Sequence, residues 1–127
     1  MKPGQTGFKR IANASVYSWQ GFKAAYQYEA AFRQELFACL LLLIVLPWIA
    51  VNALQVVVLL ASLFLLLICE IINSAIEAVV DRLGDEIHPL AGRAKDMGSS
   101  AVFLALLNVG ICWCIVGYSN FSINSFF

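Results

Sequence analysis

The pattern of hydrophobic and charged positions divides the chain into a polar N-terminal part and long uncharged runs. No charged residue lies between Leu36 and Cys69, and none lies between Met97 and Phe127. A membrane-spanning helix needs about 20 mostly apolar residues. The first run is long enough for two short spans, divided by PWIAVNA at residues 47–53, and the second run holds one more. We therefore predict an all-α membrane protein, a single domain of residues 1–127, with membrane helices over about 30–50, 53–84 and 92–118.

The stretch before the first span is predicted to form an amphipathic helix over about residues 7–28. When residues are placed at the angular spacing of an α-helix, apolar and polar side chains separate onto two faces. The mostly apolar face holds Phe8, Ile11, Ala12, Ser15, Trp19, Phe22 and Tyr26, and the opposite face holds Arg10, Asn13, Tyr17, Gln20 and Gly21. Such a pattern, with Lys and Trp present, is typical of a helix that lies along the membrane surface. By itself it predicts no more than a membrane anchor.

Composition and the placement of charges agree with a membrane protein. The 127 residues are 61% hydrophobic and 13% charged, and the eight Lys and Arg balance the eight Asp and Glu. This balance gives no indication of a nucleic-acid partner, and we expect none. The cations precede the first span or lie between the second and third spans: Lys2, Lys9, Arg10, Lys23, Arg33, Arg82, Arg93 and Lys95. By the positive-inside rule the N-terminus is cytoplasmic and the C-terminus lies on the other side of the membrane.

Acidic residues recur where the second span leaves the membrane. Glu70, Asn73, Glu77 and Asp81 are spaced by three, four and four residues. On a helix this spacing places them on one face, with Glu70 and Glu77 about 10 Å apart along the axis. A solvated helix end would explain Asp81. It explains Glu70 poorly, because Glu70 directly follows the apolar run and ionisable groups at membrane depth usually face a site or cavity.

Further charged residues border the other spans on the same side. Arg93, Lys95 and Asp96 open the third span, and Glu29 precedes the first. Carboxylate oxygens suit Mg²⁺, cations suit phosphate, and a carboxylate can accept a hydroxyl proton. These are the parts that phosphoryl transfer requires. However, the chain has no P-loop and no kinase glycine loop, so these residues alone do not establish a kinase. An ion or proton conduit would fit the same residues.

Several longer sequence motifs resemble those of a known protein family, which the spacing of single residues could not reveal. They are EAAFRQE at Glu29–Glu35, E-I-x-N-S-A-I-E-A-V-V-D-R at Glu70–Arg82, and H-x-L-x-G-R-A-K-D-M-G-S at His88–Ser99, with T-G-F-x-R-I, Y-S-W-x-G and W-C-I elsewhere. With these motifs the chain resembles the small integral-membrane diacylglycerol kinases of Gram-negative bacteria. Undecaprenol kinases of Gram-positive bacteria share the core motif, so undecaprenol is the alternative lipid substrate.

The resemblance implies an ATP-dependent lipid kinase of the bacterial inner membrane. It would transfer the γ-phosphate of Mg·ATP to diacylglycerol and form phosphatidate. The family is expected to form a homotrimeric bundle whose active sites are shared between neighbouring chains, with the C-terminus periplasmic. The main rival class, a conduit, is disfavoured because the first and third spans carry no charge at mid-depth.

The resemblance also implies roles for individual residues. Glu70 would be the general base, and Glu29 and Glu77 would bind Mg²⁺. The nucleotide would contact Arg10, Tyr17, Glu29, Glu77, Glu86, Ile87, His88, Lys95 and Asp96. The lipid would contact Ala14, Trp19, Lys23, Tyr26, Ala31, Glu35, Trp48, Val51, Glu70, Asn73, Ser99, Trp113 and Tyr118.

Overall fold

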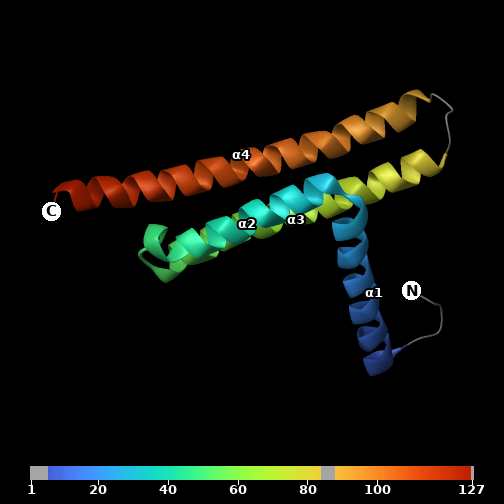
Figure 1. The fold of residues 1–127 in the computed structure, drawn as a ribbon, viewed down its shortest axis with the longest axis horizontal. Coiled ribbons are helices and arrows are strands. Elements are labelled where there is room, and N and C mark those ends of the chain that lie inside the picture. Colours follow the sequence, from blue (N-terminus) through green and yellow to red (C-terminus); the bar gives the residue numbers. More distant parts are fainter. Residues whose placement is uncertain (1–5, 84–87, 127) are drawn as a thin grey trace.

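The computed structural model describes residues 6–83 and 88–126, and these form four helices. They are α1 (Gly7–Tyr28), α2 (Ala30–Ile49), α3 (Ala53–Arg82) and α4 (Pro89–Phe126). Helices α2 and α4 both pack against α3 and run antiparallel to it, whereas α1 projects away from them at a steep angle (Figure 1). No strand occurs in the described residues. The predicted all-α class is confirmed.

Three of the helices are long and apolar enough to cross a membrane. They are α2, α3 and residues Pro89–Ser122 of α4. A helix of 30 residues, the length of α3, extends for about 45 Å, which exceeds the roughly 30 Å of a hydrocarbon core. The whole of α3 therefore cannot lie within the core, and its last turns, which carry the acidic stripe, are the part expected at the membrane edge. The position of α1 along a membrane surface stays a prediction.

The boundaries of α3 and α4 have local causes. The Asn52 side chain accepts a hydrogen bond from the backbone N–H of Gln55 at 2.9 Å, which caps α3. At the start of α4, Nδ1 of His88 accepts a hydrogen bond from the backbone N–H of Leu90 at 3.1 Å. Pro89 occupies the first helical position, where its missing N–H costs nothing. Helix α4 is longer than the predicted residues 92–118, because this cap starts it earlier and no Gly or Pro stops it after Tyr118.

The buried core is small and lies between α2, α3 and α4. It consists of Cys39, Leu63, Leu66, Val102 and Ala105. Most large apolar side chains on the outer helix faces are exposed in the single chain. This is expected of helices that face lipid or further chains, since lipid tails are as apolar as the side chains themselves.

A polar clasp joins the turn between α2 and α3 to the far end of α4. The buried Asn120 side chain donates through Nδ2 to the Ile49 carbonyl and, at 2.9 Å, to Oε1 of Gln55. Gln55 returns a hydrogen bond from Nε2 to Oδ1 of Asn120 at 3.3 Å. These bonds fix α4 against the end of the bundle opposite Glu70.

Replacing Asn120 by alanine should destabilise the bundle without slowing turnover. The change removes the hydrogen bonds of Asn120 to the Ile49 carbonyl and to both ends of the Gln55 amide, of which Oε1 keeps the Val51 N–H and Nε2 loses its partner. The loss should cost about 1–2 kcal/mol of unfolding free energy. The thermal midpoint of the purified protein measures the loss. Ser119→Ala, at the exposed neighbouring position, is the matched control. An unchanged midpoint for Asn120→Ala would refute the clasp.

Candidate active site

Glu70 is the most buried charged residue that the structure describes. It lies on α3 directly after the apolar run and is only 3% exposed. A charge this deeply buried needs compensating partners. The carboxyls of Glu29 and Glu77 also lie close to Glu70, and because their charge has the same sign they repel it and do not compensate it. Glu29 reaches it from the junction of α1 and α2, where the backbone is extended rather than helical. Helix α3 and the junction of α1 and α2 thus bring three carboxyl groups to one place.

Glu35 of α2 also lies beside Glu70. The two carboxyl groups are close enough to interact, and one carboxyl oxygen of Glu35, Oε2, is buried without a hydrogen-bond partner. Two ionised carboxylates cannot donate to each other, so a hydrogen bond between them would require one proton. The sequence analysis assigned Glu35 to the lipid and missed this pairing. The available signal was that both acids adjoin the ends of an uncharged run.

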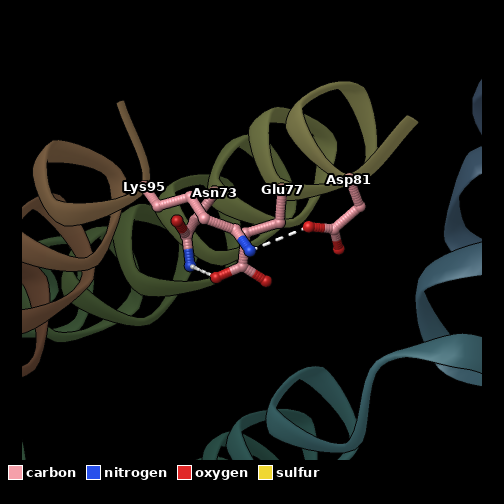
Figure 2. A network of polar contacts seen from close by, with 4 residues as sticks. All are labelled: Asn73, Glu77, Asp81 and Lys95. Carbon is pink, nitrogen blue, oxygen red and sulfur yellow. Dashed lines mark hydrogen bonds and ion pairs between the residues drawn. The ribbon is translucent and has the colours of Figure 1, made fainter. Parts of the chain in front are cut away.

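The polar residues of the stripe form two separate contacts that lie close together (Figure 2). Nδ2 of Asn73 donates to Oε1 of Glu77 at 3.5 Å. One turn further along α3, Asp81 pairs with Lys95 of α4, with 2.8 Å between Nζ and Oδ1. The spacing predicted that the stripe shares one helix face, and it does. It did not reveal Asp81 as the partner of Lys95, because that contact depends on how α4 packs.

An apolar groove lies beside this cluster, in the angle between α1 and the bundle. Its volume is about 520 Å³. The lining includes Trp19, Lys23 and Tyr26 of α1, Phe32 and Leu36 of α2, and Leu67 and Ile71 of α3. Ile71 is next to Glu70 in the chain, so the groove ends near the acidic cluster. A hydrophobic pocket with one cation at its rim suits a lipid chain better than a polar metabolite.

Comparison with known proteins identifies the family. The model of the prokaryotic diacylglycerol kinase family matches residues 16–117. The chain belongs to this family. It is 53% identical to the diacylglycerol kinase of Escherichia coli over 121 residues, which cover 95% of this chain and 99% of that protein. The diacylglycerol kinase of Pseudomonas aeruginosa is 47% identical over 113 residues, 89% of this chain and 92% of the relative. That of Haemophilus influenzae is 43% identical over 108 residues, 85% and 92%.

The family and the names of its members indicate a kinase, and with three apolar helices the chain is an integral membrane protein. The structure gives the positions of the residues that the family resemblance singled out. Those positions fall into a cluster around Glu70, a set at the opposite end of the bundle, and a set on the outer part of α1.

The resemblance to prokaryotic diacylglycerol kinases implies two metal ligands, Glu29 and Glu77. The chemistry of these carboxylates fits Mg²⁺. No three His, Cys, Asp or Glu side chains form a preformed metal cage in residues 6–83 and 88–126. Mg²⁺ does not need one, since it usually binds one or two carboxylates together with water and substrate phosphates. Glu29 and Glu77 are both half-buried, and the Asn73 amide already orients Glu77. Two such carboxylates would be enough protein ligands for an Mg²⁺ ion that also binds water and substrate phosphates.

The residues expected at the lipid occupy two levels of the bundle. Glu35, Glu70 and Asn73 lie at the acidic cluster, with the groove residues beside them. Trp48 and Val51 lie at the end of α2 and beyond it, and are 80% and 66% exposed. Tyr118, at a similar level on α4, is also exposed, whereas Trp113 donates through Nε1 to the Ser62 hydroxyl at 3.1 Å. Residues so far from Glu70 can contact only the acyl chains of a lipid whose hydroxyl is at Glu70.

The remaining candidate residues do not converge within one chain. The first turns of α1, which include Arg10, lie away from the bundle (Figure 1). Tyr17 and Ala14 also lie on α1, and Ala14 lines a shallow hollow with Trp19. Ala31, Asp96 and Ser99 are exposed on α2 and α4. His88 caps α4, and Glu86 and Ile87 are outside the described residues.

Proposed function

We propose that this chain transfers the γ-phosphate of Mg·ATP to the free hydroxyl of diacylglycerol, giving phosphatidate and ADP. One observation supports this above all: a buried carboxyl group, Glu70, lies beside a groove suited to a lipid chain, with two further carboxylates and a lysine nearby. Family membership supplies the reaction class.

Glu70 is the proposed general base. The lipid hydroxyl oxygen attacks the γ-phosphorus while its proton passes to a Glu70 carboxyl oxygen. The bond between the γ-phosphorus and the bridging oxygen breaks, and its electron pair leaves with ADP. Glu70 must be ionised at the start, so the proton in the contact between the two acids belongs to Glu35. A protonated Glu35 then donates to Glu70 and fixes its orientation toward the lipid.

The other charged groups stabilise the transferring phosphate. Mg²⁺, held by Glu29 and Glu77, would neutralise charge on the phosphate oxygens. Lys95 would contact a phosphate oxygen after exchanging Asp81 for it, and the exchange is inexpensive because this ion pair is partly exposed. The reaction needs little covalent chemistry from the protein, so positioning and charge neutralisation supply most of the catalysis.

We further propose that the chain acts as a homotrimer in the bacterial inner membrane, with the N-terminus cytoplasmic and the C-terminus periplasmic. Two features support a shared active site: Arg10 and Tyr17 lie on an outlying helix, and the outer faces of α2, α3 and α4 expose many apolar side chains. A neighbouring chain would complete the nucleotide site. The distribution of cations supports the orientation.

The deciding experiment is phosphate transfer from γ-labelled ATP by the purified protein in mixed micelles. Diacylglycerol and undecaprenol are compared side by side, with and without Mg²⁺, and Glu70→Gln protein reports any contaminating kinase. Label in phosphatidate that depends on Mg²⁺ supports the proposal. Label only on undecaprenol changes the lipid substrate. No transfer by a folded oligomer, together with ion flux into liposomes without ATP, would replace the kinase by a conduit.

Replacing Lys95 by methionine should raise the KM for ATP by roughly tenfold or more, because a charge-assisted hydrogen bond to phosphate is lost. Initial rates over a range of ATP concentrations measure the change. Lys9→Met, which removes an exposed cation of α1, is the control. Asp81→Asn should leave the thermal midpoint nearly unchanged, since the pair is 42% and 65% exposed at its two side chains. An unaltered KM in Lys95→Met would remove Lys95 from the nucleotide site.

A further inference from the structure

Gly98 lies at the closest approach of α4 to the Asn73 side chain of α3. It is buried. A methyl group built at Gly98 would overlap Oδ1 of Asn73 and would stand 3.3 Å from Cγ and 3.8 Å from Cα of the same residue. The Asn73 backbone is therefore in ordinary contact range, and only its amide group is obstructed. The space that glycine leaves is filled by that amide.

The Asn73 amide has little freedom to move elsewhere. Its Nδ2 group donates to Oε1 of Glu77, and its Oδ1 atom is buried without a hydrogen-bond partner. A buried amide oxygen without a partner is costly, so packing and not bonding keeps it against Gly98. Glycine is also unfavourable in a helix interior compared with alanine. Both observations indicate that the close fit serves something other than stability.

We propose that Gly98 is a positioning residue for this kinase: its missing side chain lets Asn73 turn toward Glu77 and hold that carboxylate in the orientation that binds Mg²⁺. The inference rests on the proposed function, in which Glu77 is a metal ligand. Gly98 touches neither metal nor substrate. It acts through Asn73, and through no other residue among its nearest neighbours in the structure.

The structure can accommodate alanine at Gly98 in two ways, and both would disturb the proposed active site. Either the Asn73 amide rotates away from Glu77, or α4 shifts and carries Lys95, one turn earlier on α4, away from Asp81. Rotation of the Asn73 amide needs no backbone movement, because the added methyl group would lie at an ordinary contact distance from Cα of Asn73. We therefore expect Gly98→Ala protein to fold, with a defect confined to Mg²⁺ use and turnover.

The test compares Gly98→Ala with two matched controls on the same helix. Gly92 and Gly110 have no atom within 4 Å of an added methyl group, so alanine at either position reports only the change in helix propensity. Gly98→Ala should lower kcat by roughly tenfold or more, the scale expected when a catalytic group is displaced by about 1 Å. It should also raise the Mg²⁺ concentration that gives half of the maximal rate. Gly92→Ala and Gly110→Ala should resemble the wild type.

A second readout does not require turnover. Mg²⁺ with a non-hydrolysable ATP analogue should raise the thermal midpoint of the wild-type protein, and Gly98→Ala should need more Mg²⁺ for the same rise. The metal-free midpoint should stay near that of Gly110→Ala. A role in helix packing alone would instead lower the metal-free midpoint and leave the Mg²⁺ dependence unchanged. This measurement still tests the inference if the wild type phosphorylates no lipid.

The double variant Gly98→Ala with Asn73→Ala separates the proposed route from any other. Asn73→Ala removes the obstructed amide, so adding Gly98→Ala should produce no further loss of turnover or Mg²⁺ affinity. If Gly98→Ala alone fails to fold, the double variant should recover folding. Wild-type behaviour of Gly98→Ala, additive losses in the double variant, a double variant that also fails to fold, or a wild type that Mg²⁺ does not stabilise would each overturn the inference.

Discussion

Glu70→Gln should reduce turnover by roughly 10²- to 10⁴-fold, the usual contribution of a general base. Glutamine has nearly the same shape and can still accept a hydrogen bond from a protonated Glu35, so the 3%-exposed position should tolerate it. It cannot take a proton from the lipid hydroxyl. The KM for ATP should change little, because Glu70 is assigned to the hydroxyl and not to phosphate. Steady-state rates with diacylglycerol in mixed micelles measure both quantities.

Two companion variants make the result specific to proton transfer. Glu70→Asp keeps a carboxylate but withdraws it from the hydroxyl, so it should retain more turnover than Glu70→Gln. Glu35→Gln preserves a donor toward Glu70 and should be milder than Glu35→Leu, which removes the donor. A Glu70→Gln protein with wild-type kcat would exclude Glu70 as the base. A loss of folding in Glu70→Gln alone would show that the acid is structural.

The sequence was sufficient for the helices because their signal is local. Uncharged runs between Leu36 and Cys69 and after Met97 indicate membrane spans wherever they occur. The four-residue spacing of Asn73, Glu77 and Asp81 is likewise a property of one helix, and the structure places them on one face (Figure 2). The end of α4 was predicted poorly, since hydropathy reports the thickness of a membrane and not the length of a helix that continues past it.

Contacts between helices could not be predicted in the same way. The pairing of Glu35 with Glu70 depends on the register of α2 against α3, and the pairing of Asp81 with Lys95 depends on the register of α3 against α4. Neither register leaves a periodic pattern in the sequence. Gly98 shows the limit most clearly, because the sequence placed it inside the predicted helix 92–118 and gave no sign of what it packs against. Its actual importance comes from a side chain on another helix.

The roles that the family resemblance implies differ in how well one chain explains them. Glu29, Glu77 and Asn73 gather near Glu70, so a single chain would supply the proposed metal ligands and the proposed base. Arg10 and Tyr17 do not approach the bundle, and they gain a physical role only if a neighbouring chain presents its own acidic cluster to them. Their proposed role therefore depends on the homotrimer more strongly than the role of Glu70 does.

Glu77→Gln should raise the Mg²⁺ concentration for half-maximal turnover by roughly tenfold or more, because a hard anionic ligand is replaced by a neutral amide. The Asn73 amide can still donate to the remaining carbonyl oxygen, so the local fold should persist. At saturating Mg²⁺ part of the lost rate should return, unlike in Glu70→Gln, whose defect no metal concentration repairs. Mg²⁺ titrations of initial rate at fixed Mg·ATP separate the two cases.

Asp81→Asn is the matched control for Glu77→Gln. It removes one negative charge from the same face of α3 one turn later, and it touches Lys95 rather than Asn73. If general loss of negative potential governs Mg²⁺ binding, both variants should raise the requirement alike. If Glu77 is a ligand, only Glu77→Gln should do so. A flat Mg²⁺ response in Glu77→Gln would remove this residue from the metal site, and with it the reason for Asn73 to be held against Gly98.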